Sequence, residues 1–244
     1  QYDKPLCLGG GVEIDVEGRP KTIRLTRIHL EEDVGKNMHF ARSSGVDFNR
    51  AGIPLMEIVT EPDLASPEEA QAFLLALKHL LLYAGVSECN LEQGNLRCDV
   101  NCSIRPRGET RLGVKAEIKN MNTFKGVFHA AQAEIRRQAE LLDAGQSVHQ
   151  ETLRYDPDLD VTVPMRSKEY AHDYRYFPEP DLLPVALDAA TIEAWSRALP
   201  ERPRQRRERF VREYGLPEYD ARVLVADQAV ADYFEETARQ AGNP

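Results

Sequence analysis

The chain has 244 residues, of which 42% are hydrophobic and 29% charged, and its formal net charge is −9 at pH 7. This composition is typical of a globular protein with one large domain, or one domain plus part of a second. It excludes a membrane-spanning chain, because no run approaches about 18 apolar residues, and it argues against non-specific nucleic-acid binding over the whole surface.

The first 60 residues carry strand patterns. Residues 12–16 alternate, a turn follows over 17–20, and a second run has apolar residues at 23, 25, 28 and 30, so a hairpin is expected. A polar loop is expected around 42–45 and another strand over 53–60. The chain begins without a start methionine or a signal-peptide pattern, which suggests that upstream sequence is missing.

Two amphipathic helices follow. The first is expected over 66–83, because Ser66 is a natural N-cap, Pro67 suits the first helical position and Glu69 completes a capping box. The second is expected over 123–143. Both are expected to pack against a sheet.

Between these helices, residues 95–105 and 114–119 alternate with a period of two, which places the polar groups of each segment on one strand face. An exposed sheet surface would explain this pattern, but such surfaces favour Thr, Lys and Glu. The polar set here suits phosphate and metal instead. It comprises Arg97, Asp99, Asn101, Glu117, Lys119 and Asn120.

From about residue 199 the pattern becomes helical, with helices expected over 203–214, 217–225 and 227–241. Residues 199–203 resemble an interdomain joint. The helices are too few to close a separate core, so the second domain is expected to be cut short.

Arginines crowd the first of these helices. They are Arg202, Arg204, Arg206, Arg207, Arg209 and Arg212. A charge run on a helix is usually a solvated face, which is the favoured interpretation, and contact with phosphates is the alternative.

Several familiar sites are excluded. The four cysteines form no C-x-x-C pair, so a zinc site is not expected, and reduced thiols fit a cytosolic protein. No Walker, G-x-G-x-x-G or G-x-S-x-G motif is present. Carboxylate chemistry remains, and carboxylates suit Mg²⁺ that carries nucleotide phosphates.

Five strings make the sequence specific. They are R-I-H-L-E-E-D-V-G-K (27–36), D-F-N-R-A-G-I-P-L-M-E-I-V-T-E-P-D (47–63), N-L-R-C-D-V-N (95–101), A-E-I-K-N-M-N (116–122) and M-R-S-K-E-Y-A-H-D-Y-R-Y-F-P-E-P-D (165–181). In this order and spacing they resemble the B subunit of the glutamyl-tRNA(Gln)/aspartyl-tRNA(Asn) amidotransferase, over nearly the whole chain. Members of that family also carry an upstream G-L-E-V-H motif, a longer helical region and a tail domain, all absent from this sequence.

The resemblance implies an α+β fold, with a mixed-sheet "cradle" domain over 1–198 and the start of an all-helical domain over 199–244. It implies that ATP and Mg²⁺ serve to phosphorylate the side-chain carboxylate of Glu or Asp mischarged on tRNA, before ammonia displaces the phosphate. The implied partners are mischarged Glu-tRNA(Gln) or Asp-tRNA(Asn), the amidase A subunit, plus the small C subunit, in a cytoplasmic heterotrimer without a membrane. The fragment alone is expected to be inactive.

That chemistry explains the residue types. A carboxylate is a poor electrophile, and conversion to an acyl phosphate supplies a leaving group, while cations offset the charge of the two anions. By resemblance, Glu32 and Glu57 match metal ligands, and Asp99 matches an acidic position near the nucleotide. We assign Asn101 and Lys119 to the cofactor site with Asp99.

Arg97, Lys119 and Arg175 are the expected catalytic partners of phosphate or carboxylate groups. The family usually shows E-E-G-S where this chain has E-Q-G-N, which leaves any role of Gln93 and Asn95 in doubt.

Other charged residues receive a structural interpretation. Glu31 and Asp33 are expected to be solvated charges at a strand end, and His29 and His172 to lie on a polar face or loop. For residues 173–178, two interpretations stay open: a role in the site, and an internal ion pair with aromatic packing.

Two other functions stay open: a non-catalytic tRNA-binding or assembly module, and a carboxylate–amine ligase for a free metabolite. The arginine-rich helix discriminates between them, because only the tRNA functions need it.

Overall fold

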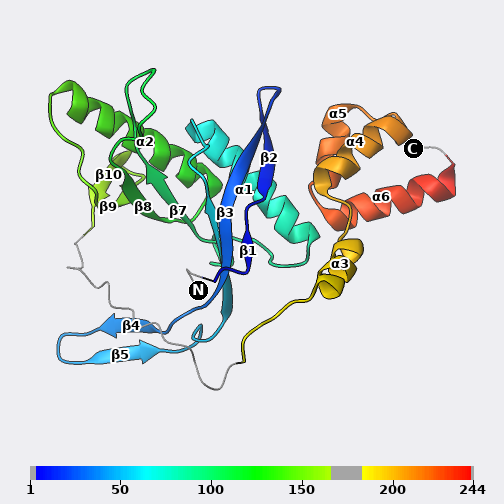
Figure 1. Cartoon of the computed structure of the whole chain (residues 1–244), viewed down its shortest axis with the longest axis horizontal. Helices are drawn as coiled ribbons and strands as arrows, with labels where there is room; N and C mark the ends of the chain where they lie inside the picture. Colours follow the sequence, from blue (N-terminus) through cyan, green and yellow to red (C-terminus); the bar gives the residue numbers. More distant parts are fainter. Residues whose placement is uncertain (1–3, 166–182, 243–244) are drawn as a thin grey trace. The chain divides into compact units, whose positions relative to one another are not determined.

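The computed structural model describes residues 4–165 and 183–242; within them strands come first, strands and helices are mixed in the middle, and the last elements are helices (Figure 1). The predicted α+β fold with a mixed sheet is confirmed. The chain divides into two compact units, Gln1–Ala76 and Leu77–Pro244. The boundary that the sequence suggests at residue 199 stays a prediction. No helix within the described residues has both the length and the apolar character needed to cross a membrane.

The first unit is built on one long strand. Strand β3 (Arg19–Glu32) has 14 residues and pairs antiparallel with β1 (Cys7–Leu8), β2 (Gly11–Val16) and β6 (Pro54–Thr60). The hairpin and the strand over 53–60 are therefore confirmed. The buried apolar residues of this unit include Val12, Ile14, Ile23, Phe73 and Leu74.

A two-stranded ribbon replaces the polar loop expected around residues 42–45. Strand β4 (Lys36–His39) pairs antiparallel with β5 (Ser44–Asp47), and the Phe40 N–H donates to the Ser43 carbonyl at 2.9 Å to close the turn. The predicted loop holds only for residues 42 and 43 at the tip, and it is wrong for Ser44 and Gly45, which lie in β5. The strands beside the tip lack a buried apolar face that would have revealed them.

Helix α1 (Pro67–Tyr83) begins where the capping signals place it. The Ser66 hydroxyl accepts a hydrogen bond from the Glu69 N–H at 3.3 Å, and the Glu69 carboxylate accepts one from the Ala65 N–H at 2.7 Å. The reciprocal half of the capping box thus reaches one residue further back than the usual pattern. After the helix, Gly85 adopts a positive φ of 66° that suits glycine.

The second unit contains a four-stranded sheet in the order β10-β9-β8-β7. Strands β8 (Ala116–Met121) and β9 (Thr152–Asp156) run parallel and are joined through α2 (Phe124–Asp143). The two edge strands are antiparallel to their neighbours: β7 (Cys98–Cys102) pairs with β8, and β10 (Val161–Pro164) pairs with β9. The sequence did not predict β9 and β10, because each is short and offers little alternation.

A buried carboxylate holds α2 to this sheet. Glu134 is fully buried and accepts hydrogen bonds from Arg137 at 2.8 Å, from Gln138 at 2.7 Å and from the Thr162 hydroxyl of β10 at 2.8 Å. The Gln138 amide in turn donates to the Cys102 carbonyl at 3.0 Å and accepts from the Ile104 N–H at 3.1 Å. Each of these buried polar groups therefore has a partner, as a low-dielectric interior requires.

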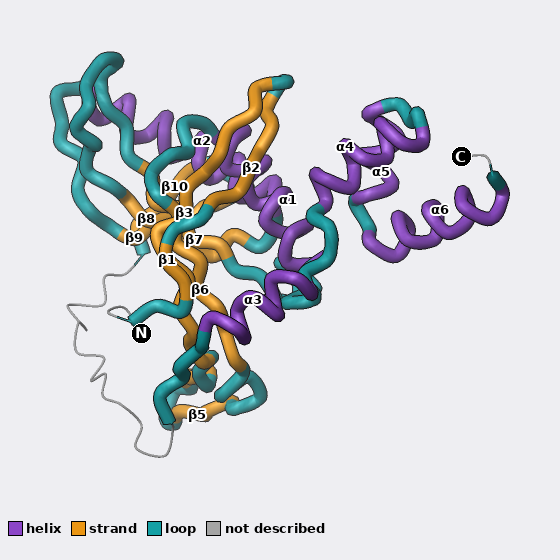
Figure 2. The backbone as a smooth tube through the Cα atoms, turned by 45° about the vertical axis from the view of Figure 1, so that its right-hand side comes forward, coloured by secondary structure: helices purple, strands orange, loops and turns teal. Residues whose placement is uncertain are grey.

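Four helices follow in the last part of the described chain (Figure 2). Helices α4 (Pro203–Tyr214), α5 (Glu218–Val225) and α6 (Gln228–Ala241) match the predicted ranges closely. They enclose a small core around Phe210, whose ring lies 5.1 Å from that of Phe234. The expectation that these helices are too few to close a core is therefore wrong. The Tyr83 hydroxyl of α1 donates to the Val225 carbonyl of α5 at 2.9 Å.

Helix α3 (Ala189–Ala198) is an addition to the prediction, which began the helical region near residue 199. The Asp188 side chain caps it by accepting the Thr191 N–H at 2.7 Å. None of its residues is buried.

The arginines of α4 divide into two that are internally ion-paired and others that lie nearer the surface. The buried Arg206 contacts Asp232 at 2.6 Å and Glu235 at 2.9 Å, and Arg209 contacts Glu235 at 2.6 Å. Shorter-range pairs engage the other arginines of the helix. They are Arg204 with Glu208, Arg207 with Glu218, and Arg212 with Glu213. The solvated face therefore stays the interpretation for the exposed Arg204 and Arg212. It is wrong for Arg206 and Arg209, which belong to an internal charge network.

We expect Glu134→Gln to lower the free energy of unfolding by about 2–4 kcal/mol. Glutamine has nearly the same volume, but its one carbonyl oxygen cannot serve all the donors that surround the carboxylate. Urea denaturation measures the change. The matched control is Glu140→Gln on the exposed side of α2, which should stay within about 0.5 kcal/mol of the wild type. Equal stability of the two variants would contradict the role given to Glu134.

The helical region should lose stability in acid. The hydrogen bonds from Arg209, followed by those from Arg206, lower the pKa of Glu235 from its ordinary value of 4.5 to about 2. Its contribution is therefore complete above pH 4.5 and is lost as the pH falls toward 2. Stability measured by circular dichroism across this window should fall less in Glu235→Gln than in the wild type. Glu236→Gln on the exposed face of α6 should leave the profile unchanged.

Candidate functional site

One face of the second unit's sheet collects the polar residues that the sequence singles out. The Lys119 ammonium of β8 lies 3.1 Å from an Asp99 carboxylate oxygen of β7 and 3.3 Å from a Glu117 carboxylate oxygen. In the parallel pairing, Arg154 of β9 lies opposite Lys119. Asn101 is exposed and pairs with Glu117.

A shift in register produces this arrangement. Cys98 pairs with Met121 but Val100 pairs with Ile118, so Lys119 and Asn120 together oppose the single residue Asp99. Such irregularities re-aim side chains and are common beside active sites.

The charge state of Lys119 follows from these neighbours. Partial burial opposes the charged form, but the hydrogen bond to Asp99 and the charges of Asp99 and Glu117 outweigh burial and raise the pKa of Lys119 above its ordinary value. The side chain therefore stays protonated. Asp99 and Glu117 hold it over the strands.

The structure thus brings Asp99, Asn101 and Lys119 to one face, and their assignment to a cofactor site stays a prediction. Arg97 is exposed and lies just before β7. Arg175 lies outside the described residues, as do His172 and the segment 173–178. The catalytic roles of Arg97, Lys119 and Arg175 stay predictions.

A second cluster lies in the first unit, where β3 meets β6. The His29 ring is 1% exposed, and its Nε2 atom lies 2.9 Å from a Glu31 carboxylate oxygen and 3.2 Å from a Glu57 carboxylate oxygen. His29 and Glu57 are direct cross-strand partners, and Glu31 follows His29 on the same strand face. Potential ligand atoms of all three residues lie within 4.8 Å of one another.

The cluster disfavours two ionised carboxylates without a cation. Burial, followed by the hydrogen bond and the charge from Glu31, raises the pKa of Glu57, against the opposing effects of His29 and Arg27. A divalent cation would reverse this effect, because it binds the deprotonated oxygens. Two carboxylates fit Mg²⁺, which completes its coordination with water, whereas an imidazole ligand also suits softer divalent metals.

Glu32 does not join this cluster. It lies opposite Pro54 and is exposed, since side chains alternate along β3 and Glu32 projects from the face opposite to Glu31. Of the two expected metal ligands, only Glu57 belongs to the cluster, and the role of Glu32 stays a prediction. The sequence-based interpretation gave Glu31 and His29 no site role. Their i, i+2 spacing places them on one face of a strand, but it does not show how β3 is aligned with β6 and so does not bring Glu57 beside them.

Asp33 is buried rather than solvated, which corrects the expectation for that residue. Its carboxylate accepts the Val34 N–H at 2.9 Å and lies 3.7 Å from the Arg50 guanidinium. Its backbone exchanges hydrogen bonds with Gly52 and Ile53 at 2.9 and 2.8 Å. Asp33 therefore fixes the turn at 50–53 against the end of β3 and sets the start of β6.

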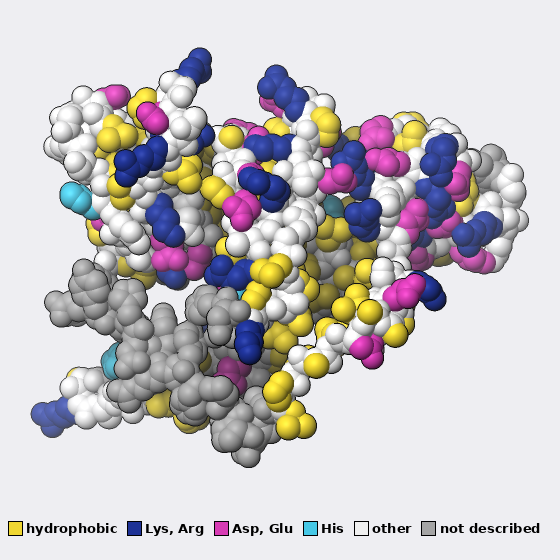
Figure 3. Space-filling view, viewed as in Figure 1, with side chains coloured by type: hydrophobic (Ala, Val, Ile, Leu, Met, Phe, Trp, Pro, Cys, Tyr) yellow, Lys and Arg dark blue, Asp and Glu magenta, His cyan; other side chains and the backbone are white. Residues whose placement is uncertain are grey.

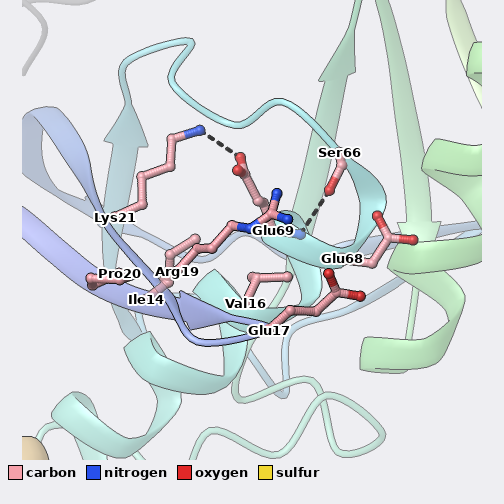
Figure 4. Close-up of a pocket in the computed structure, with 9 residues that line it drawn as sticks. All are labelled: Ile14, Val16, Glu17, Arg19, Pro20, Lys21, Ser66, Glu68 and Glu69. Atoms are coloured by element: carbon pink, nitrogen blue, oxygen red, sulfur yellow. Dashed lines mark hydrogen bonds and ion pairs between the residues drawn. The ribbon is translucent and has the colours of Figure 1, made fainter.

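A hollow of about 360 Å³ also lies in the first unit, beside the N-terminus of α1 (Figure 4). It offers Arg19 and Lys21, but Glu17, Glu68 and Glu69 line it as well. The Glu69 carboxylate forms an ion pair with the Lys21 ammonium at 2.6 Å. The lining carries three carboxylates and two cations, so this hollow is not a built anion site.

The chain is similar over its whole length to known proteins. A family model described as the GatB/GatE catalytic domain matches residues 1–193. The aspartyl/glutamyl-tRNA(Asn/Gln) amidotransferase B subunit from Anaeromyxobacter sp. (strain Fw109-5) is 54% identical over 239 residues, covering 97% of this chain and 50% of that protein. The B subunits of Caldicellulosiruptor saccharolyticus and Methylacidiphilum infernorum are each 51% identical, cover 100% of this chain and are themselves covered to 51% and 53%. The chain spans about half the length of the curated relatives it matches.

We expect Glu57→Gln to stabilise the metal-free chain at pH 7. The raised pKa of Glu57 means that ionising this carboxyl costs stability, so the gain should vanish below its ordinary value of 4.5. The gain should stay below about 1 kcal/mol, because the side chain is 43% exposed and water screens the repulsion. Urea denaturation at both pH values tests this, with Glu17→Gln as an exposed control. A loss of stability at pH 7 would contradict the repulsion.

Proposed function

The chain belongs to the family of aspartyl/glutamyl-tRNA(Asn/Gln) amidotransferase B subunits, and from this premise we propose that it carries the carboxylate-activating site of a tRNA-dependent amidotransferase. In this proposal the γ-phosphoryl group of ATP is transferred to the side-chain carboxylate of Glu or Asp attached to tRNA. Ammonia then attacks the acyl phosphate and releases phosphate, leaving the amide.

The cluster of His29, Glu31 and Glu57 is the observation that carries this proposal. Its two carboxylates fit a divalent cation, because the repulsion between Glu31 and Glu57 would be relieved by a positive charge between them. When bound, Mg²⁺ would offset the negative charge of the nucleotide and substrate carboxylate. Because His29 Nε2 faces both carboxylates, use of that atom as a ligand would require its proton to be held on Nδ1 instead.

The polar sheet face supports phosphate binding in the same proposal. The Lys119 ammonium supplies a positive charge, and Asp99 and Glu117 orient it through contacts at 3.1 and 3.3 Å. Arg154 adds a planar donor from the adjacent strand. An incoming phosphate oxygen would compete with Asp99 for Lys119, so Asp99 acts in holding the ammonium ready between turnovers.

The partners follow from the same family membership. We propose that the amidase A subunit delivers ammonia, that the small C subunit is the third member of a cytoplasmic heterotrimer, and that mischarged Glu-tRNA(Gln) or Asp-tRNA(Asn) is the substrate. The names of the relatives support an amidotransferase that acts on tRNA. The free cysteines among the described residues fit a reducing compartment.

The test is ATP hydrolysis that depends on charged tRNA, measured in the complete complex across a Mg²⁺ titration. Glu57→Gln should lower turnover by about 100-fold or more, since removal of groups that support a metal already costs 10–100-fold. Glu31→Gln and Glu32→Gln separate the two ligand sets, because only the true ligand should alter the Mg²⁺ dependence. Glu17→Gln, at an exposed turn, is the control.

Each alternative function gives a different result. Wild-type turnover and Mg²⁺ dependence in Glu57→Gln would overturn the metal site. ATP hydrolysis that responds to a free amino acid but not to charged tRNA would identify a metabolite ligase. A complex whose ATP hydrolysis is insensitive to every substitution in this chain would leave it as a binding or assembly module.

A further inference from the structure

The connection between β7 and β8 is strongly basic. Its residues 105–115, called here the basic loop, contain Arg105, Arg107, Arg111 and Lys115 but only the carboxylate of Glu109. These four cations and one carboxylate give a net charge of +3, in a chain whose net charge is −9. Every residue of the loop is exposed. In Figure 1 the loop extends away from the sheet, and dark-blue side chains stand out at this part of Figure 3.

The loop is held in one conformation by its own hydrogen bonds. The Glu109 N–H donates to the Pro106 carbonyl at 3.1 Å, which closes a turn in which Gly108 has a φ of 91° that favours glycine. The Arg105 guanidinium donates to the Thr110 carbonyl at 2.7 Å across the loop. The Glu109 carboxylate accepts the Thr110 and Arg111 N–H groups at 3.2 and 3.3 Å.

The base of the loop is fixed to the core. The Ile104 N–H donates to the buried Gln138 side chain at 3.1 Å. Opposite it, a Cβ atom on Gly113 would lie only 2.2 Å from the Ile104 carbonyl oxygen, so the two arms of the loop meet at a distance that only glycine permits. A loop ordered in this way gives up little conformational freedom when it binds a ligand.

Three cations project from this frame without a carboxylate partner. Among the described residues, the side chains of Arg107, Arg111 and Lys115 form no ion pair. The arginines of α4 differ, because each has a Glu or Asp partner in the same chain. Figure 3 shows this difference as dark-blue and magenta side chains intermixed over α4–α6.

We propose that the basic loop binds backbone phosphates of the tRNA substrate, through Arg107, Arg111 and Lys115. The inference rests on the proposed function, which supplies the tRNA. A polyanion suits this surface better than a protein partner does, because protein interfaces have cores depleted of charge whereas nucleic-acid contacts concentrate cations. Guanidinium groups also match phosphate oxygens in a bidentate geometry.

The test measures the affinity of the complete complex for tRNA at several salt concentrations, without turnover. The triple variant Arg107→Ala, Arg111→Ala, Lys115→Ala should weaken binding by about tenfold or more and flatten the plot of log affinity against log salt by about 2–3 units. The matched control removes three positive charges from α4, through Arg204→Ala, Arg207→Ala and Arg212→Ala. It should change the slope by less than about one unit, because those charges are already compensated.

Other outcomes overturn the proposal in distinct ways. Unchanged affinity and slope in the loop variant would show that the loop does not touch RNA. Loss of complex assembly with an unchanged tRNA slope, measured by analytical ultracentrifugation, would assign the loop to an acidic protein partner. At saturating tRNA the loop variant should keep wild-type ATP hydrolysis. A wild-type complex that binds tRNA but never hydrolyses ATP would defeat the proposed function and leave the binding result standing.

Discussion

The buried carboxylate of Glu134 is the constraint on which the second unit depends. An ionised group without water must be compensated, and here Arg137, Gln138 and Thr162 supply the donors. Thr162 ties β10 to α2, and Gln138 ties the end of β7 to the same helix. The charge therefore specifies which strands flank α2. It also fixes the point at which the basic loop leaves the sheet.

Each candidate site lies near a break in strand register. In β3, Leu25 pairs with Thr60 and Arg27 with Val59, so Thr26 is an extra residue that interrupts the alternation before His29 and Glu31. In β8, the corresponding irregularity sets Lys119 against Asp99. An extra residue changes which face a side chain occupies, so small shifts decide which carboxylates meet.

Local signals predicted the elements whose stability is local. The capping residues of α1, the range of α2 and the periodicity of α4–α6 are readable from the sequence and agree with the structure. Strand β9 depends on parallel pairing with the distant β8, and β10 is tied to α2 by the Thr162–Glu134 hydrogen bond. No local pattern contains either interaction. The choice between Glu31 and Glu32 likewise depends on the register of β3 with β6, and the resemblance alone favoured Glu32.

The arginines show why charge counted along a sequence does not identify a binding surface. Glu235 accepts hydrogen bonds from Arg206, Arg209 and Arg239, so the most arginine-rich helix spends much of its charge on holding α4 to α6. Glu235 lies 29 residues from Arg206 and 26 from Arg209 along the chain, so no local pattern pairs them. The basic loop has fewer cations, but its single carboxylate is bound to backbone N–H groups and leaves them uncompensated. The electrostatic potential at a surface depends on which cations lack a carboxylate partner within the protein. Only the folded structure shows which cations these are.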